Sequence, residues 1–167
     1  MAKTYKFEQE RKFLKAGYFM KDQDGNMVYE AKMLTQPLIG AYDFDFINHL
    51  TNRTESHKVS KTTTVQMDDG GLNTKSWFKL NGENIWDYLH ELGIRIDSHM
   101  SKDKFGLTYN VTLKGQPMAV ITTSSPGGKS PITVNNFLDV TVEDDKDLDL
   151  AFLVAFASAR TEQGFLS

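Results

Sequence analysis

The chain has 167 residues, of which 40% are hydrophobic and 25% charged, and its formal net charge is −3, a composition typical of a globular domain rather than a disordered or collagen-like chain. The acidic balance argues against a nucleic-acid-binding protein, because that binding rests on a basic surface. The sequence contains no cysteine, which excludes a disulfide framework, a thiolate metal site and a cysteine nucleophile.

The amino-terminal segment is not followed by a long apolar run, so the sequence predicts neither a secretory signal nor an anchor. The most apolar segment, residues 150–157, is far shorter than the roughly 20 residues that cross a bilayer. We therefore expect a single cytoplasmic domain over residues 1–167, with no transmembrane segment.

Short β-branched and aromatic runs, separated by Gly, Asn and Asp, predict an antiparallel sheet protein. The expected strands are residues 12–20, 27–33, 42–50, 57–66, 77–80, 94–100, 105–114, 117–123 and 137–143. The sequence Asp-Gln-Asp-Gly-Asn at 22–26 predicts a hairpin turn, because an Asp-Gly pair adopts positive φ angles readily. It also resembles the first half of a calcium loop, but the expected acidic ligand is replaced by Met33 and Leu34, so we expect a metal-free turn.

Two segments have helical spacing instead. Residues 84–93 place Ile85 and Leu89 one turn apart, with Asn84 as the N-cap and Gly93 just past the end. Residues 147–163 form the second predicted helix, and the acidic run at 143–149 suits the start of a helix. Residues 150–157 are apolar on all sides, so this helix must be surrounded by protein. A mainly β, closed or nearly closed barrel with the helix as its plug satisfies that requirement.

Many strands followed by one all-round apolar helix, entered by Phe-Leu-Asp-Val-Thr-Val-Glu-Asp-Asp-Lys-Asp-Leu-Asp at 137–149, resemble the tubby carboxy-terminal-like superfamily, in particular its LURP-one-related branch. The early strand pair around Asp-Gly-Asn is similar to that family's opening hairpin. The resemblance implies an antiparallel barrel of about 12 strands enclosing a hydrophobic helix. Within the same superfamily, tubby domains bind phosphoinositides, and scramblases are associated with membranes and calcium. No ligand-binding residue of those proteins matches a position here, and fold alone does not transfer function.

The residues that could carry chemistry do not assemble into a catalytic motif. The four histidines have no metal-binding spacing, and the pair Asp97 and His99, which could orient a general base, has no identifiable nucleophile. Ser124 and Ser125 lack the Gly-x-Ser-x-Gly setting, and no phosphate-binding glycine motif occurs. The sequence therefore predicts no catalytic residue, no metal site and no cofactor.

Two groups of residues are candidates for binding. Arg53, Lys58 and Lys61 could meet an anionic lipid headgroup, although Lys58 and Lys61 have opposite strand parity. Trp77 and Trp86 belong to the strongest concentration of aromatic residues in the sequence, which could line a ligand site.

The leading hypothesis is a non-enzymatic binding or scaffold protein with an anionic lipid headgroup as ligand. The alternative is a small-ligand-binding protein or an enzyme with a site at a barrel end, near Trp77, Trp86, Asp97 and His99. The sequence leaves the oligomeric state open.

Overall fold

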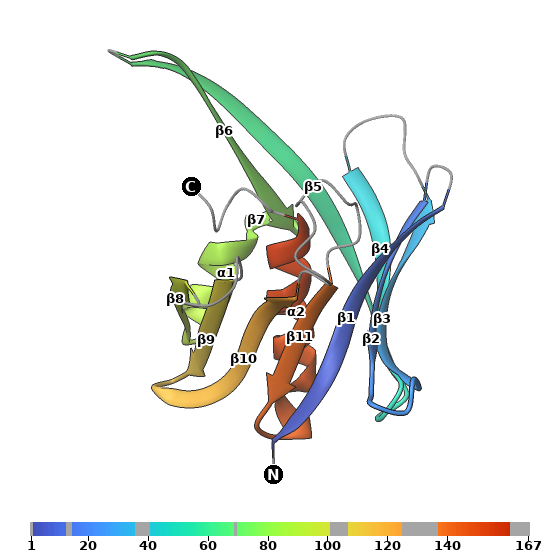
Figure 1. The fold of residues 1–167 in the computed structure, drawn as a ribbon. Helices are drawn as coiled ribbons and strands as arrows, with labels where there is room; N and C mark the ends of the chain where they lie inside the picture. Colours follow the sequence, from blue (N-terminus) through green and yellow to red (C-terminus); the bar gives the residue numbers. More distant parts are fainter. Residues whose placement is uncertain are drawn as a thin grey trace.

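The computed structural model describes residues 2–12, 15–35, 41–68, 70–100, 107–124 and 137–160. Within these residues the protein is mainly β, with one antiparallel sheet of eleven strands and two α-helices (Figure 1). The strands are β1 (Lys3–Lys12), β2 (Lys15–Lys21), β3 (Met27–Thr35), β4 (Ala41–Asn48), β5 (Arg53–Asp68), β6 (Gly71–Leu80), β7 (Glu83–Asn84), β8 (Ile94–Met100), β9 (Leu107–Leu113), β10 (Gln116–Ser124) and β11 (Phe137–Val142).

Strands adjacent in sequence are neighbours in the sheet everywhere except across the helical link between β7 and β8, and β1 pairs with β11 in addition to β2. The spatial order is β7-β6-β5-β4-β3-β2-β1-β11-β10-β9-β8, so the first strand pairs with the last. In that pair Tyr5 lies opposite Val140 and Phe7 opposite Leu138. All four side chains are buried, so apolar packing as well as backbone pairing joins the first and last strands.

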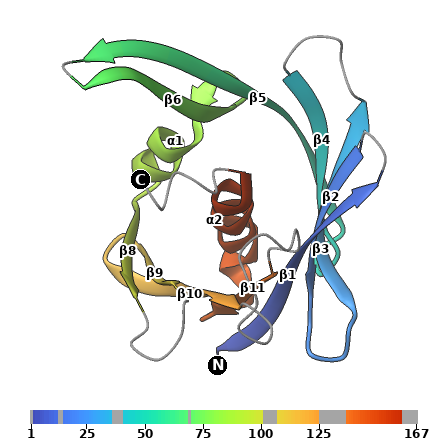
Figure 2. The ribbon, with the colours of Figure 1, turned by 45° about the horizontal axis from the view of Figure 1, so that its top comes forward.

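The sheet curls around helix α2 (Leu148–Arg160), which stands in the middle of the ring of strands in Figure 2. Ala151, Phe152 and residues 154–157 are 0% exposed and Leu153 is 8% exposed, so the prediction of an all-round buried helix is confirmed. Rings from several strands pack on it: Phe152 lies 4.2 Å from Tyr29, and Phe156 lies 4.9 Å from Tyr18, centroid to centroid. The apolar circumference of α2 is thus satisfied by side chains from different strands.

The two outermost strands, β7 and β8, are not joined by any ladder among the described residues. Helix α1 (Ile85–Glu91) links them and lies in the gap between them (Figure 2). Its Ile85 and Leu89 are each 1% exposed, so the helix covers the core where strand pairing stops. The sequence predicted a closed or nearly closed barrel, and the family resemblance implied about 12 strands. The described residues form a curled sheet of eleven strands with a helix between its edges.

Several predicted boundaries change in the structure. The sequence interpretation missed β1 altogether and placed one strand at 12–20, where the structure ends β1 at Lys12 and begins β2 at Lys15. β5 and β6 are both longer than the predicted strands at 57–66 and 77–80. The first two residues of the predicted strand at 105–114, and the end of the second helix beyond Arg160, lie outside the described residues.

The predicted turn and the predicted helix caps are confirmed. The Asp22 carboxylate accepts the backbone N–H groups of Asp24 (3.0 Å) and Asn26 (2.9 Å), and Gly25 has a φ of +83°. At α1, Asn84 accepts the backbone N–H of Trp86 at 2.9 Å, and Gly93 follows the helix with a φ of +94°. Local side-chain chemistry therefore determines these three positions.

The acidic run before α2 stabilises the helix entry. The Asp144 side chain accepts the N–H of Lys146 and so caps the 3₁₀ helix η2 (Asp145–Asp147). Asp145 accepts the phenol O–H of Tyr5 at 2.7 Å and pairs with Lys3 at 2.8 Å. These contacts hold the start of the helical segment against β1.

Among the described residues, no helix has the length and apolar character needed to cross a membrane.

Candidate functional site

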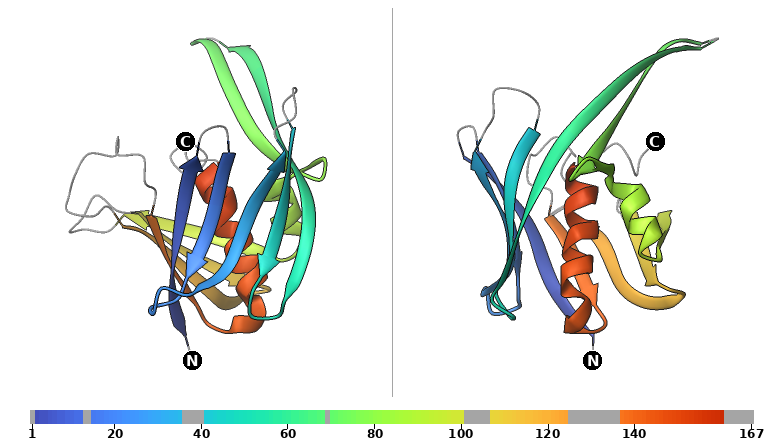
Figure 3. Two further views of the ribbon diagram at one scale, coloured as in Figure 1. Left: turned by 90° about the vertical axis from the view of Figure 1, so that its right-hand side faces the viewer. Right: turned by 180° about the vertical axis from the view of Figure 1, so that it is seen from behind.

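A long hairpin formed by β5 and β6 extends out of the molecule (Figures 1 and 3). The two strands pair without a register shift from Val59 opposite Leu80 to Asp68 opposite Gly71. Among the described residues, β4 pairs with β5 only as far as Ser60, and β7 pairs with β6 only at Lys79 and Leu80. Residues 61–77, which we call the arm, therefore continue where their neighbouring strands have stopped.

The hairpin differs in charge from the rest of the chain. Residues 58–80 contain four lysines and two aspartates, a net charge of +2, whereas the whole chain carries −3. The lysines are Lys58, Lys61, Lys75 and Lys79. Asp68 is the last residue of β5 and Asp69 follows it in the sequence, so the basic residues belong to the strands of the hairpin.

Register positions divide these residues between the two faces of the hairpin. Lys79 lies opposite Ser60, Trp77 opposite Thr62 and Lys75 opposite Thr64. Alternate positions of a strand share a face, so these positions lie on one face together with Lys58. Lys61 lies opposite Phe78 and belongs to the other face. The side chains of Lys61, Lys75 and Trp77 lie outside the described part of the structure.

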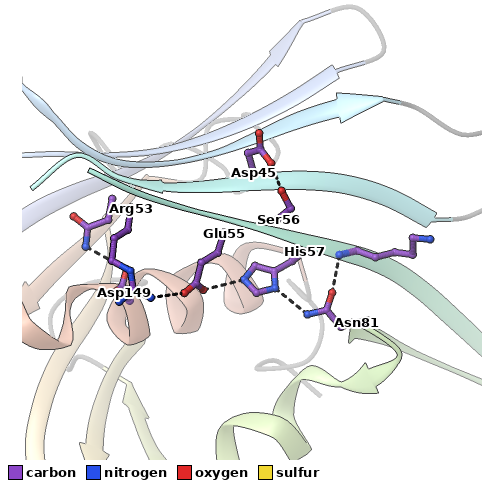
Figure 4. Close-up of polar contacts among 9 residues, drawn as sticks. Asp45, Arg53, Glu55, Ser56, His57, Asn81 and Asp149 are labelled. Atoms are coloured by element: carbon purple, nitrogen blue, oxygen red, sulfur yellow. Dashed lines mark hydrogen bonds and ion pairs between the residues drawn. The ribbon is translucent and has the colours of Figure 1, made fainter. Parts of the chain in front are cut away.

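A polar row lies on the face of β5 that includes the buried Val59, close to helix α2 (Figure 4). Arg53 Nη2 lies 3.1 Å from Glu55 Oε1, and the other Glu55 oxygen lies 3.4 Å from His57 Nε2. Because Arg53 already faces a carboxylate of its own chain, its charge is partly compensated. The side chains of Arg53 and Glu55 are 69% and 56% exposed, so water also screens this pair.

His57 connects the polar row to the base of the hairpin. Asn81 Nδ2 lies 2.8 Å from His57 Nδ1, and Asn81 Oδ1 accepts the backbone N–H of Lys58 at 2.9 Å. Since the amide oxygen is used by Lys58, the amide N–H points to His57, so His57 Nδ1 acts as the acceptor and its Nε2 carries the proton. The imidazole also packs edge-on against Phe46, 5.0 Å between ring centroids. Asn81 thus fixes the point where the hairpin leaves the body.

A second polar group joins α2 to the strands beside it. Asp149 accepts Asn48 Nδ2 at 3.2 Å, and the amide oxygen of Asn48 accepts the N–H groups of Leu50 and Thr51. Burial raises the pKa of the Tyr29 phenol above its usual range, and its hydrogen bond to Asp149 adds to that effect. These groups satisfy one another, which indicates a structural role for them.

The candidate residues from the sequence do not converge on one point. Arg53 and Lys58 lie five positions apart on a regularly paired strand and so occupy opposite faces of β5. Lys58 lies opposite Asp43 of β4 in the ladder. Trp86 is on α1 and packs against the core, whereas Trp77 is on the arm. The hairpin brings Lys58 and Trp77 together on one face and leaves Arg53, Lys61 and Trp86 elsewhere.

The outer side of α1 carries an acidic depression lined by Glu83, Asp87, His90 and Glu91. Desolvation and the neighbouring carboxylates of Glu91 and Asp87 raise the pKa of Glu83. No group of three or more His, Asp or Glu side chains within the described residues is arranged to hold a metal ion. Asp97 and His99 are the two residues that could orient a general base. Asp97 is exposed on β8, and the side chain of His99 lies outside the described part of the structure.

Two comparisons of the sequence with known proteins found no match. No protein-family model matches the chain, and no curated protein sequence matches it. The function must therefore be argued from the residues themselves.

Proposed function

We propose that the protein is a non-enzymatic binding module that recognises anionic lipid headgroups through its β5–β6 hairpin. The observation that carries this proposal is the placement of Lys58, Lys75, Trp77 and Lys79 at register positions of one hairpin face. Basic residues near a membrane surface contribute about 1 kcal/mol each, and tryptophan favours the membrane–water interface. A cytoplasmic location and a tubby-like barrel completed around α2 are parts of the same proposal.

The charge distribution favours contact along the strands of the hairpin. Asp68 lies at the tip, where an anionic surface would repel it, and the lysines lie farther back. Arg53 contributes less than the sequence suggested, because Glu55 lies 3.1 Å away. The hairpin would therefore lie along the membrane with its lysine-bearing face toward the headgroups.

Cosedimentation with phosphatidylcholine vesicles, with and without phosphatidylserine, tests the proposal. We expect binding only to the anionic vesicles and a steep loss with salt, since exposed charges are screened over about 10 Å at moderate ionic strength. Lys75→Glu and Lys79→Glu should each weaken binding roughly fivefold or more. Lys61→Glu on the other hairpin face, and Lys146→Glu on η2, are matched charge reversals that should have much smaller effects.

The two tryptophans provide an independent measurement. In Trp86→Phe the arm residue Trp77 is the sole tryptophan, and in Trp77→Phe the partly buried Trp86 remains. Anionic vesicles should shift the emission of the first variant to the blue and leave that of the second unchanged. No cosedimentation of the unmodified protein at low salt would refute the proposal. Equal losses in all four lysine variants would refute the assignment to one hairpin face.

A small-ligand site near α1 is the second candidate. The depression on α1 offers carboxylates from Glu83, Asp87 and Glu91, which would suit a cationic ligand rather than an anionic one. A ligand that binds the folded protein raises its melting temperature. A thermal-shift screen of polyamines and other small cations on the unmodified protein, with Glu91→Gln as the comparison, separates this candidate from lipid binding.

A further inference from the structure

The side-chain amide of Asn81 is shared between two partners at the base of the β5–β6 hairpin (Figure 4). Its oxygen accepts the backbone N–H of Lys58 at 2.9 Å, and its nitrogen lies 2.8 Å from His57 Nδ1. The backbone N–H of Asn81 also donates to the carbonyl of Lys58 at 2.8 Å. Three hydrogen bonds therefore tie the turn at Asn81 to β5, and one of them depends on the protonation of His57.

The partners fix the direction of each hydrogen bond. The N–H of Lys58 can only donate, so the amide of Asn81 must present its oxygen there, and its own N–H then points to His57. His57 Nδ1 can accept that N–H only when it carries no proton. A neutral His57 with its proton on Nε2 therefore satisfies both ends of the amide.

Proton uptake by His57 leaves no arrangement that satisfies both partners. The imidazolium carries an N–H on each ring nitrogen, so Nδ1–H and the amide N–H of Asn81 become two facing donors. Turning the amide over offers its oxygen to Nδ1–H but places its N–H against the N–H of Lys58. A charge-assisted hydrogen bond is roughly twice as strong as a neutral one, so the oxygen turns to His57 and the N–H of Lys58 loses its acceptor.

The surroundings of His57 allow the ring to take up a proton. Its side chain is 20% exposed, and Glu55 Oε2 lies 3.4 Å from Nε2. The other Glu55 oxygen pairs with Arg53, and Figure 4 places Asp149 of α2 at the Arg53 end of the same polar row. β4 contributes the uncharged ring of Phe46. Glu55 thus favours the imidazolium, whereas the amide N–H at the base of the hairpin favours the neutral ring.

We propose that Asn81 and His57 form a proton-sensitive latch at the base of the hairpin. The latch is closed when His57 is neutral, and it opens when the imidazole takes up a proton between about pH 5 and 8, where histidine titrates. Opening frees the N–H of Lys58 and loosens the attachment of the β6–β7 turn to β5. The backbone bond from Asn81 to the carbonyl of Lys58 remains, so the hairpin stays paired. All the groups of the latch belong to this chain, so it does not rest on lipid binding.

Hydrogen exchange of the Lys58 N–H measures the state of the latch in the unmodified protein. From about pH 8 to about pH 5.5 its protection factor should fall roughly fivefold, because one hydrogen bond is lost. The N–H of Trp86 is the matched control, because Asn84 Oδ1 holds it at 2.9 Å and both groups are neutral over this range. Its protection should stay constant. His57→Phe keeps a ring against Phe46 and should remove the pH dependence at Lys58.

Asn81→Asp should reverse the sign of the effect. One carboxylate oxygen can accept the N–H of Lys58 and the other the Nδ1–H of the imidazolium. This contact needs a charged His57, so its contribution is present in acid and is lost as the pH rises, whereas that of the native amide is lost as the pH falls. From about pH 8 to about pH 5.5 the melting temperature of the variant, relative to the unmodified protein, should therefore rise by about 2–4 °C. In a His57→Phe background the same substitution should give no such shift.

Nitrogen NMR of the imidazole tests the closed state directly. At about pH 8 the proton of His57 should be on Nε2, and a proton on Nδ1 would overturn the proposal. Constant protection of the Lys58 N–H, or an equal change in His57→Phe, would overturn it too. The same holds for a melting shift of Asn81→Asp that is equal in both backgrounds. The NMR and exchange measurements use the unmodified protein, so they decide the question even where a variant fails to fold.

Discussion

Helix α2 and the β5–β6 arm use their apolar residues in opposite ways. Phe152 and Phe156 on α2 are 0% exposed, whereas Met67 on the arm is 83% exposed. α2 touches rings from several strands, while the arm is held beyond Ser60 by the pairing of its own two strands in the described part of the chain. Burial around α2 therefore stabilises this protein, whereas the arm is available for contact with other molecules.

The largest expected effect comes from emptying the space around α2. Phe156→Ala should lower the free energy of unfolding by about 3–5 kcal/mol, because it removes a buried ring that packs against Tyr18, Phe44 and Phe46. Phe156→Leu keeps most of the volume and should cost about 1.5 kcal/mol or less. Urea melts of both variants measure the difference. A loss below about 1 kcal/mol for the alanine variant would contradict the central role of α2.

A smaller effect is expected where β1 holds the entry to α2. Tyr5→Phe removes the O–H that donates to Asp145 at 2.7 Å and should cost about 1–2 kcal/mol at neutral pH. The hydrogen bonds from Lys3 and Tyr5 hold the pKa of Asp145 below its usual range.

The lowered pKa of Asp145 also predicts the direction of the pH dependence. Its stabilising contribution is fully present above the pKa of the carboxyl in the unfolded chain. The contribution is lost as the pH falls through the lower pKa of the folded protein. The stability difference between the unmodified protein and Tyr5→Phe should therefore shrink in acid, as thermal melts across this range would show. A difference that grows in acid would contradict the assignment.

The smallest effect is expected on the arm. Met67→Ser should change the free energy of unfolding by no more than about 0.5 kcal/mol, because the side chain is already in water. The same urea melts provide the measurement, with Phe156→Ala as the contrast. A loss above about 1 kcal/mol would show that the arm packs against the body and would remove the distinction between the two regions.

The candidate binding residues were only partly predictable. Arg53, Lys58 and Lys61 are close in sequence and were grouped for that reason, yet the two faces of a strand separate Arg53 from Lys58. The pairing of Arg53 with Glu55 has a sequence signal, since alternate residues share a strand face. The link from His57 to Asn81 has none, because the two residues are 24 positions apart and meet only through the β5–β6 hairpin.

The sequence by itself determined the features that depend on neighbours along the chain. The apolar circumference of residues 150–157 required a surrounded helix, Asp-Gly-Asn specified a turn, and Asn84 with Gly93 delimited α1. A strand at β1 had a sequence signal that our prediction missed, and only the tertiary structure decided its partner in the sheet. Its apolar Tyr5 and Phe7 alternate with charged and polar residues, and they become buried by pairing with β11, more than 130 positions away. It also decided the reach of the arm, because an edge is exposed only where the neighbouring strands end. Partners distant in sequence determine both features, and local propensity carries no record of them.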